Sequence, residues 1–168
     1  MKQATKHEAT YNWMFLLAAV ATFTLIAFVS QALATPKPAD AKGKIFAQAL
    51  VEATVAKHPE LQGLGLATTP PDGHFCVTIA DTDAKELGDK CDAGELAVMK
   101  SGKATVEKEA DAYDVTIPFR LGKKTIGIIG MDFKLDQQEA GILDKAKAIA
   151  KEVVDQIPQK AKLFEAAQ

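Results

Sequence analysis

The stretch YDVTIPFRLGKKTIGIIGMDFK, residues 113–134, decides the fold. Its first half alternates apolar and polar side chains, which is typical of a strand, and we predict one over residues 113–121. Apolar β-branched residues resume after a turn at residues 122–124 and predict a second strand over residues 125–135. Two strands joined by so short a turn form an antiparallel hairpin, so the surrounding sheet should be antiparallel as well.

The sequence on either side of this hairpin predicts three more strands, a short helix and two long helices. We place the strands over residues 61–68, 74–80 and 104–108, and the short helix over residues 94–101. Apolar residues at helical spacing predict a first helix from a cap at Asp40 to Lys57. A last helix should begin at a capping box of Asp136 and Glu139 and end at Pro158.

These elements predict an α+β fold with one domain over residues 40–158 and a tail over residues 159–168. Both long helices are amphipathic, so they should cover one face of a five-stranded antiparallel sheet. The opposite face also needs cover, and the loop and short helix of residues 81–101 are available as a lid. A chain of 168 residues has room for one such domain.

The N-terminus has the features of an export signal. A basic start is followed by an apolar run over residues 13–29 and by the triplet Ala32-Leu33-Ala34, which fits a cleavage site. We predict a signal peptide over residues 1–34, a Pro-containing linker over residues 35–39 and a periplasmic or otherwise extracytoplasmic domain. The apolar run approaches the ~17 residues that can span a bilayer. The alternative is therefore an uncleaved, single-pass anchor in the inner membrane, with the domain outside the cytoplasm.

The composition argues against several classes of function. A net charge of -2 offers no basic surface for nucleic acid. The sequence has no nucleophile elbow and no phosphate-binding glycine loop. Asp81 and Asp83 lack the glutamate at the twelfth position of a calcium loop, so a solvated turn is the simpler interpretation. We expect a protein that is not an enzyme and that needs no cofactor or metal.

Cys76 and Cys91 are the two cysteines of the chain. In an oxidising compartment such a pair suggests one disulfide, which would fasten the lid to the strand that carries Cys76. Two unlinked buried thiols are the alternative. A thiol-based enzyme would need an activated cysteine, and the sequence places no convincing group of Lys or His beside either sulfur.

The segment CVTIADTDAKELGDKCDAGELAVMKSGKATVEKE, residues 76–109, and the hairpin of residues 113–134 together resemble the single Cache family of extracytoplasmic, PAS-like (PDC) sensor domains. The matching features are a strand, an aspartate turn, a glycine loop, a short helix and the closing hairpin. The resemblance spans about residues 40–157 and implies a PAS-like fold with a small molecule bound between sheet and lid. Members of the family usually lie between two membrane helices, and this sequence has no downstream membrane helix and no output domain.

The resemblance places candidate ligand contacts on the side of the hairpin that faces the lid. If Val115, Ile117 and Phe119 pack on the long helices, the side chains between them face the lid. Arg120, the one arginine of the chain, could bind a carboxylate or could simply lie exposed beside the turn. The candidate ligand-binding residues are Thr78, Tyr113, Asp114, Thr116, Arg120 and Met131.

We therefore expect an exported, small-molecule-binding domain of the sensor type that acts through a separate membrane receptor or transporter. The small molecule is not identified by the sequence. The alternative is a ligand-free structural or accessory protein of the cell envelope, with its lid collapsed onto apolar side chains. The two amphipathic helices could also pair in a homodimer, although burial against the sheet explains their apolar stripes equally well.

Overall fold

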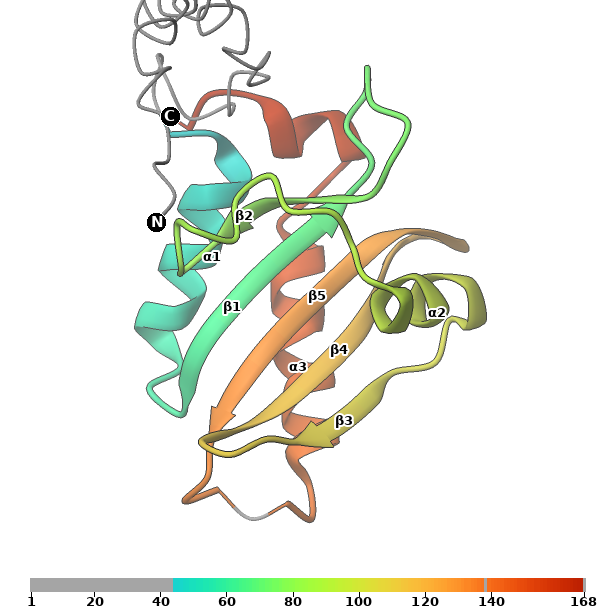
Figure 1. Ribbon diagram of the computed structural model, residues 1–168. Helices are drawn as coiled ribbons and strands as arrows, with labels where there is room; N and C mark the ends of the chain where they lie inside the picture. The colour runs from blue at the N-terminus through green and yellow to red at the C-terminus, as the bar shows by residue number, and fades with distance from the viewer. Residues whose placement is uncertain (1–43, 138, 168) are drawn as a thin grey trace, which may run out of the picture. The chain divides into compact units, whose positions relative to one another are not determined.

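The computed structural model describes residues 44–137 and 139–167 (Figure 1). The predicted export segment, the linker and the helix cap at Asp40 lie outside the described residues. Among the helices that are described, none is both long enough and apolar enough to cross a membrane.

A five-stranded antiparallel sheet forms the middle layer, in the strand order β2-β1-β5-β4-β3. The strands are β1 (Leu61–Thr68), β2 (Val77–Asp81), β3 (Thr105–Lys108), β4 (Ala112–Leu121) and β5 (Lys124–Lys134). The turn between β4 and β5 contains Gly122 at φ 62°, a left-handed conformation that glycine adopts without steric cost. The α+β class and the five-stranded antiparallel sheet predicted from the sequence are confirmed.

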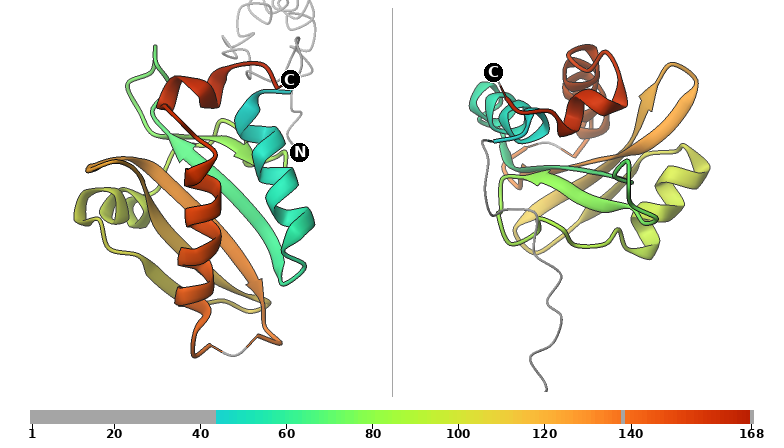
Figure 2. Two further views of the ribbon diagram at one scale, coloured as in Figure 1. Left: turned by 180° about the vertical axis from the view of Figure 1, so that it is seen from behind. Right: turned by 90° about the horizontal axis from the view of Figure 1, so that it is seen from above.

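Helices α1 (Phe46–Lys57) and α3 (Ile142–Asp155) cover one face of this sheet, as the view from behind shows (Figure 2). Helix α1 packs on β1 and β2, and α3 packs mainly on β4. The short helix α2 (Ala93–Ser101) contacts β4 and β5 from the opposite side (Figure 1). Two long helices on one face and a thinner lid on the other are the predicted arrangement.

The main hydrophobic core lies between the sheet and the two long helices. Alternate side chains of the central strands point into it, because successive residues of a strand face opposite sides. The sheet contributes Leu64, Leu66, Val115, Ile117, Phe119, Ile129, Met131 and Phe133. Helix α3 contributes an apolar stripe that the sequence predicted, with Ile142, Ala146, Ile149, Ala150 and Val153 buried.

Several element boundaries differ from the sequence prediction. Helix α1 begins at Phe46 and not near Asp40, because Ile45 is extended and pairs with Ala166. Helix α3 begins at Ile142 rather than at Asp136, and its N-cap is Gly141 at φ 98°. The polar residues after β5 form a turn, and Ile142 is the first side chain that reaches the core. Strand β2 begins at Val77, because the preceding turn leaves Phe75 62% exposed and unable to join the alternation.

The two ends of the described domain are joined by backbone hydrogen bonds. The amide of Phe46 donates to the carbonyl oxygen of Glu165 at 2.7 Å, and the amide of Ala167 donates to that of Lys44 at 2.8 Å. Between them runs the 3₁₀ helix η1 (Lys160–Phe164), which buries Leu163 completely in the main core.

Candidate functional site

The lid is fastened to the edge of the sheet by a disulfide and by backbone hydrogen bonds. Cys76 and Cys91 form the disulfide, with their Cα atoms 5.4 Å apart. The amide of Cys91 donates to the carbonyl oxygen of Cys76 at 3.1 Å, and the amide of Thr78 donates to that of Asp89 at 2.9 Å. The lid segment thus returns along β2 and covers an edge that would otherwise have free backbone groups.

Helix α2 continues the lid and buries little of its own surface against the sheet. Asp92 and Glu95 form a capping box at its start, in which the Asp92 carboxylate accepts from the Glu95 amide at 2.8 Å. Val98 is its one fully buried side chain, in a small cluster with Ala67, Cys76 and Ile128. Most of the sheet face beneath the lid is therefore not filled by apolar side chains.

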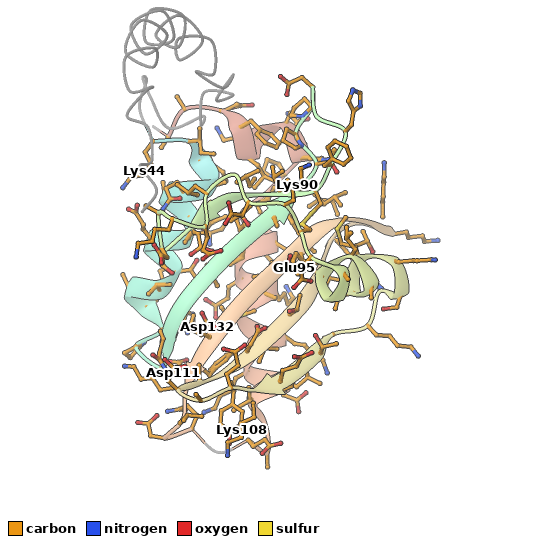
Figure 3. The ribbon with its side chains drawn as sticks, viewed as in Figure 1. Lys44, Lys90, Glu95, Lys108, Asp111 and Asp132 are labelled. Atoms are coloured by element: carbon orange, nitrogen blue, oxygen red, sulfur yellow. A yellow bond between two sulfur atoms is a disulfide. The ribbon has the colours of Figure 1, made fainter. Side chains whose placement is uncertain are left out.

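A pocket of about 450 Å³ lies between this sheet face and the lid. Its walls come from β1, β2, β4, β5, the lid loop, α2 and the turn before β4. Eight carboxylates line it: Asp81, Asp83, Glu86, Glu95, Glu109, Asp111, Asp114 and Asp132. Lysine, arginine and histidine are absent from the lining that the described residues form. Figure 3 shows Glu95 on α2 and Asp132 on β5 on the same side of the sheet.

Glycines form part of the pocket floor, beside Ala67 and Ile128. Gly63 and Gly65 on β1 and Gly130 on β5 all line it. A Cβ atom on Gly63 would come within 2.5 Å of the Asp132 carboxylate, and one on Gly65 would overlap the carboxylate of Asp81. Glycine inside a strand weakens the strand and often marks a place where a ligand approaches the backbone closely.

Two of the carboxylates belong to residues that are register partners on neighbouring strands, and the carboxylate of Asp132 leans over Gly63 on β1. Asp114 on β4 is paired with Asp132 on β5, and like charges in this relation destabilise a sheet. Among the described residues, no hydrogen bond or ion pair stabilises either carboxylate. Burial, and then the charge of Asp132, raise the pKa of Asp114 to about 6, and burial and nearby acidic groups raise the pKa of Asp132 as well.

Asp81 is the last residue of β2, and its carboxylate lies over Gly65 on β1. One carboxylate oxygen accepts from the amide of Asp83 at 2.7 Å, which shapes the aspartate turn that opens the lid. Its pKa is raised to about 6, mainly by burial and partly by the charge of Glu86, although the Asp83 amide opposes the shift. Asp81, Asp114 and Asp132 therefore all hold protons more tightly than isolated aspartates do.

The structure brings only part of the predicted ligand set to this pocket. Thr78, Asp114 and Met131 line it, although the Met131 side chain is buried in the helix-side core. Tyr113 is not in the lining, because its position in the strand alternation directs it into that same core. Thr116 is buried and also does not line the pocket.

Arg120 binds the lid helix instead of the pocket. Its guanidinium donates to the carbonyl oxygen of Gly102 at 2.9 Å. Gly102 is the C-cap of α2 at φ 66°, so the cation lies where a helix end carries partial negative charge. The placement gives Arg120 a structural role in holding the end of the lid.

Sequence reasoning missed the glycine floor and Asp132. The alternation of Gly63 and Gly65 was a usable signal, because two glycines at spacing two leave one face of a strand bare. Within the described residues, no group of three or more His, Cys, Asp or Glu side chains converges in a way that could hold a metal ion.

No family model matches the sequence, and no characterised protein was found as a significant relative. Several solved structures are similar in fold. A GAF domain from an Acinetobacter phosphoenolpyruvate-protein phosphotransferase has a TM-score of 0.49 and 9% identity, covering 68% of this chain and 82% of its own. The GAF domain of a two-component sensor histidine kinase from Bacillus halodurans has a TM-score of 0.49 and 8% identity, covering 68% and 91%.

A type II free methionine-R-sulfoxide reductase from Thermoplasma acidophilum is also similar, with a TM-score of 0.41 and 16% identity, covering 71% of this chain and 93% of its own. At these scores and identities the neighbours carry no argument about what this chain binds or catalyses.

Proposed function

We propose that this chain is an exported sensor-type domain of the single Cache kind that binds a small, positively charged organic molecule between its sheet and its lid. It has no catalytic role in this proposal. It acts through a membrane receptor or transporter partner, which reads the ligand-bound state of the lid.

The observation that carries the proposal is the pocket of about 450 Å³ with eight carboxylates and no cationic side chain in its described lining. Its volume is in the range of small-ligand sites. Half-buried carboxylates that lack partners favour a cation, because an ammonium group would supply the charge-assisted hydrogen bonds that they lack. A free carboxylate or phosphate would meet only like charge.

The accessory alternative predicts a lid collapsed on apolar side chains. The lid of this structure buries Val98 in a small apolar cluster and leaves a pocket lined by carboxylates beside that cluster. This difference favours the binding function over the accessory one.

A thermal-shift screen of the full chain, purified in detergent so that either form of the N-terminus is retained, tests the proposal. The compounds are amines, amino acids, carboxylates and purines. A ligand at about 100 times its Kd stabilises a protein by roughly 2.7 kcal/mol, which is several degrees for a domain of this size. We expect hits among the amines and none among the carboxylates.

The matched variants are Asp114→Asn in the pocket and Asp72→Asn in the exposed turn before β2. Each removes one carboxylate charge, so they change the net charge equally. Asp114→Asn should abolish or weaken the shift, and Asp72→Asn should retain it. A screen without hits would favour the accessory role, and hits that both variants retain equally would place the ligand outside this pocket and overturn the proposal.

A further inference from the structure

The two edges of the sheet differ in how they are covered. The lid segment returns along the edge formed by β2, where the amide of Thr78 donates to the carbonyl oxygen of Asp89. The other edge is formed by β3, which pairs with β4 on its inner side and with no described strand on its outer side. Strand β3 lies at the rim of the domain (Figures 1 and 2), and all four of its side chains are exposed. An exposed strand edge can pair with another chain.

The outward backbone groups of β3 belong to its even-numbered residues. The amide of Glu109 donates to the carbonyl oxygen of Ala112 at 2.9 Å, in the same register that pairs β3 with β4. Hydrogen-bonded and non-hydrogen-bonded pairs alternate along an antiparallel ladder, so the amides and carbonyls of Ala104, Val106 and Lys108 point away from β4. Among the described residues, these outward groups have no hydrogen-bond partner.

We propose that this edge is the interface of a homodimer, in which the β3 strands of two copies pair antiparallel about a two-fold axis at Val106. Val106 then exchanges two hydrogen bonds with Val106 of the second copy. On each side of the axis, Ala104 exchanges two more with the partner's Lys108. The two five-stranded sheets join into one continuous sheet. The surface lies outside the glycine floor of the pocket, and the inference does not depend on which molecule the pocket binds.

The charges along this edge are self-complementary in the proposed register. Lys103 lies opposite the partner's Glu109, and the two-fold axis repeats the same pair on the other side. Neither side chain forms an ion pair within the described part of the chain. Val106 is 36% exposed in the single chain, and at the axis it packs against its own copy. Charge and apolar contact therefore favour a second copy of this chain as the occupant of the edge.

Neighbouring registers and other surfaces fit a dimer less well. An axis at Thr105 would require Gly102 to pair with the partner's Lys108, but Gly102 has φ 66° and is not extended. An axis at Glu107 would place two identical carboxylates opposite each other. The apolar stripes of the two long helices, the other candidates for self-association, pack against the sheet in the main core.

The dimer would also change the rim of the pocket. Glu109 is one of the carboxylates that line it, so the partner's Lys103 would add a cation beside this carboxylate. A single pair of short strands buries less than the ~1,200 Å² of a stable interface, so the dimer should be weak, with a Kd on the order of 100 µM.

Sedimentation velocity of the full chain in density-matched detergent tests the proposal, at concentrations from about 5 µM to about 1 mM. We expect the mass to rise from one chain toward two. Lys103→Glu and Glu109→Lys each place like charges opposite one another and should weaken the dimer at least tenfold. An equimolar mixture of these two variants has opposite charges in both pairs and should recover the wild-type dimer. Lys123→Glu, in the exposed β4–β5 turn, is the matched charge control and should associate like the wild type.

Val106→Cys tests the register directly. Hydrogen-bonded residues opposite each other have Cα atoms about 5.5 Å apart, which a disulfide can span. The variant should therefore form covalent dimers under mild oxidation. Thr105→Cys is the matched control, because its two copies are offset along the strands, and we expect at least fivefold less covalent dimer. Adding Lys103→Glu to Val106→Cys should reduce the covalent dimer, which distinguishes specific pairing from random collision.

The outcomes either support the inference or overturn it. The mass of a single chain at the highest concentration would overturn it. So would a dimer that Lys103→Glu and Lys123→Glu leave equally stable, because that dimer would use another surface. Failure of the mixed variants to recover the dimer, or equal cross-linking of Val106→Cys and Thr105→Cys, would overturn the pairing of β3 about Val106. A thermal-shift screen without hits would remove the proposed function and leave this inference unchanged.

Discussion

The two faces of the sheet are made by the same strands and differ in almost every physical respect. On β5, Phe133 is completely buried under the long helices, while its neighbour Asp132 faces the pocket with an unpartnered carboxylate. The helix side is a continuous apolar core, and the lid side consists of glycine, carboxylates and one small apolar cluster. The alternation of a strand lets one segment provide stability on one face and a binding surface on the other.

The largest expected effect comes from the helix face. Phe133→Ala removes a large, fully buried side chain and leaves a cavity, which costs about 3–5 kcal/mol. Urea unfolding followed by circular dichroism measures this free energy. A loss below about 1 kcal/mol would mean that the helix-side core is not the main source of stability.

Loss of the disulfide should lower the free energy of unfolding somewhat less than Phe133→Ala does. Replacing Cys76 and Cys91 together by alanine frees a segment whose cysteines are 15 residues apart in sequence, and the chain-entropy model gives a loss of about 3 kcal/mol. The same unfolding experiment with the wild type, with and without a dithiol reductant, should give a matching difference. A variant as stable as the wild type would show that the backbone hydrogen bonds to β2 hold the lid alone.

The acidic face predicts that stability falls as the pH rises. The pKa values of Asp81 and Asp114 are about 6 in the folded domain, above the ordinary value of 3.8, so the folded state binds more protons than the unfolded state between about pH 4 and 6. The free energy of unfolding therefore decreases across this interval. Because both groups remain partly exposed, screening reduces the effect to about 1 kcal/mol each, or about 5 °C in Tm together.

Thermal melts from pH 4.5 to 7.5 without ligand test this dependence. The double variant Asp81→Asn and Asp114→Asn should flatten the profile. A wild-type Tm that rises through this interval would contradict the assignment. Amine binding should show the opposite trend and weaken below pH 6, as the carboxylates take up protons.

The smallest expected change in stability comes from Asp132, the neighbour of Phe133 on β5. Asp132→Asn removes one charge of the opposed pair with Asp114 and should stabilise the ligand-free domain by about 0.2–1 kcal/mol. Urea unfolding at pH 7.5 should give changes in the free energy of unfolding of opposite sign for Asp132→Asn and Phe133→Ala. Destabilisation by Asp132→Asn would mean that its carboxylate has a structural partner in solution.

The sequence was sufficient to predict the antiparallel sheet, because the local patterns of strands, turn and helix all indicated the same fold. The alternation of β4, the turn at Gly122 and the apolar stripe of α3 each depend on residues that are close along the chain. The start of α3 was predicted wrongly, because Asp136 and Glu139 have the spacing of a capping box. Packing against the core, which decides the first helical residue, is not visible in that spacing.

The pocket was harder to predict because it depends on register. Asp114 and Asp132 are 18 residues apart, and only the pairing of β4 with β5 puts them opposite each other. A shift of one residue would have placed one of them in the core. Arg120, the most conspicuous candidate from composition, binds Gly102 because the lid helix ends beside the hairpin turn.

The hydrogen bonds that join Lys44 to Ala167 and Phe46 to Glu165 have a consequence for engineering. Because these backbone atoms are within 3 Å of each other, a linker of a few residues can connect position 167 to position 44. New termini can then be opened in the exposed turn at Asp72. Such a circular permutant keeps every strand pairing and both faces of the sheet. Because the two ends of the domain are adjacent, the domain can also be inserted into a surface loop of another protein.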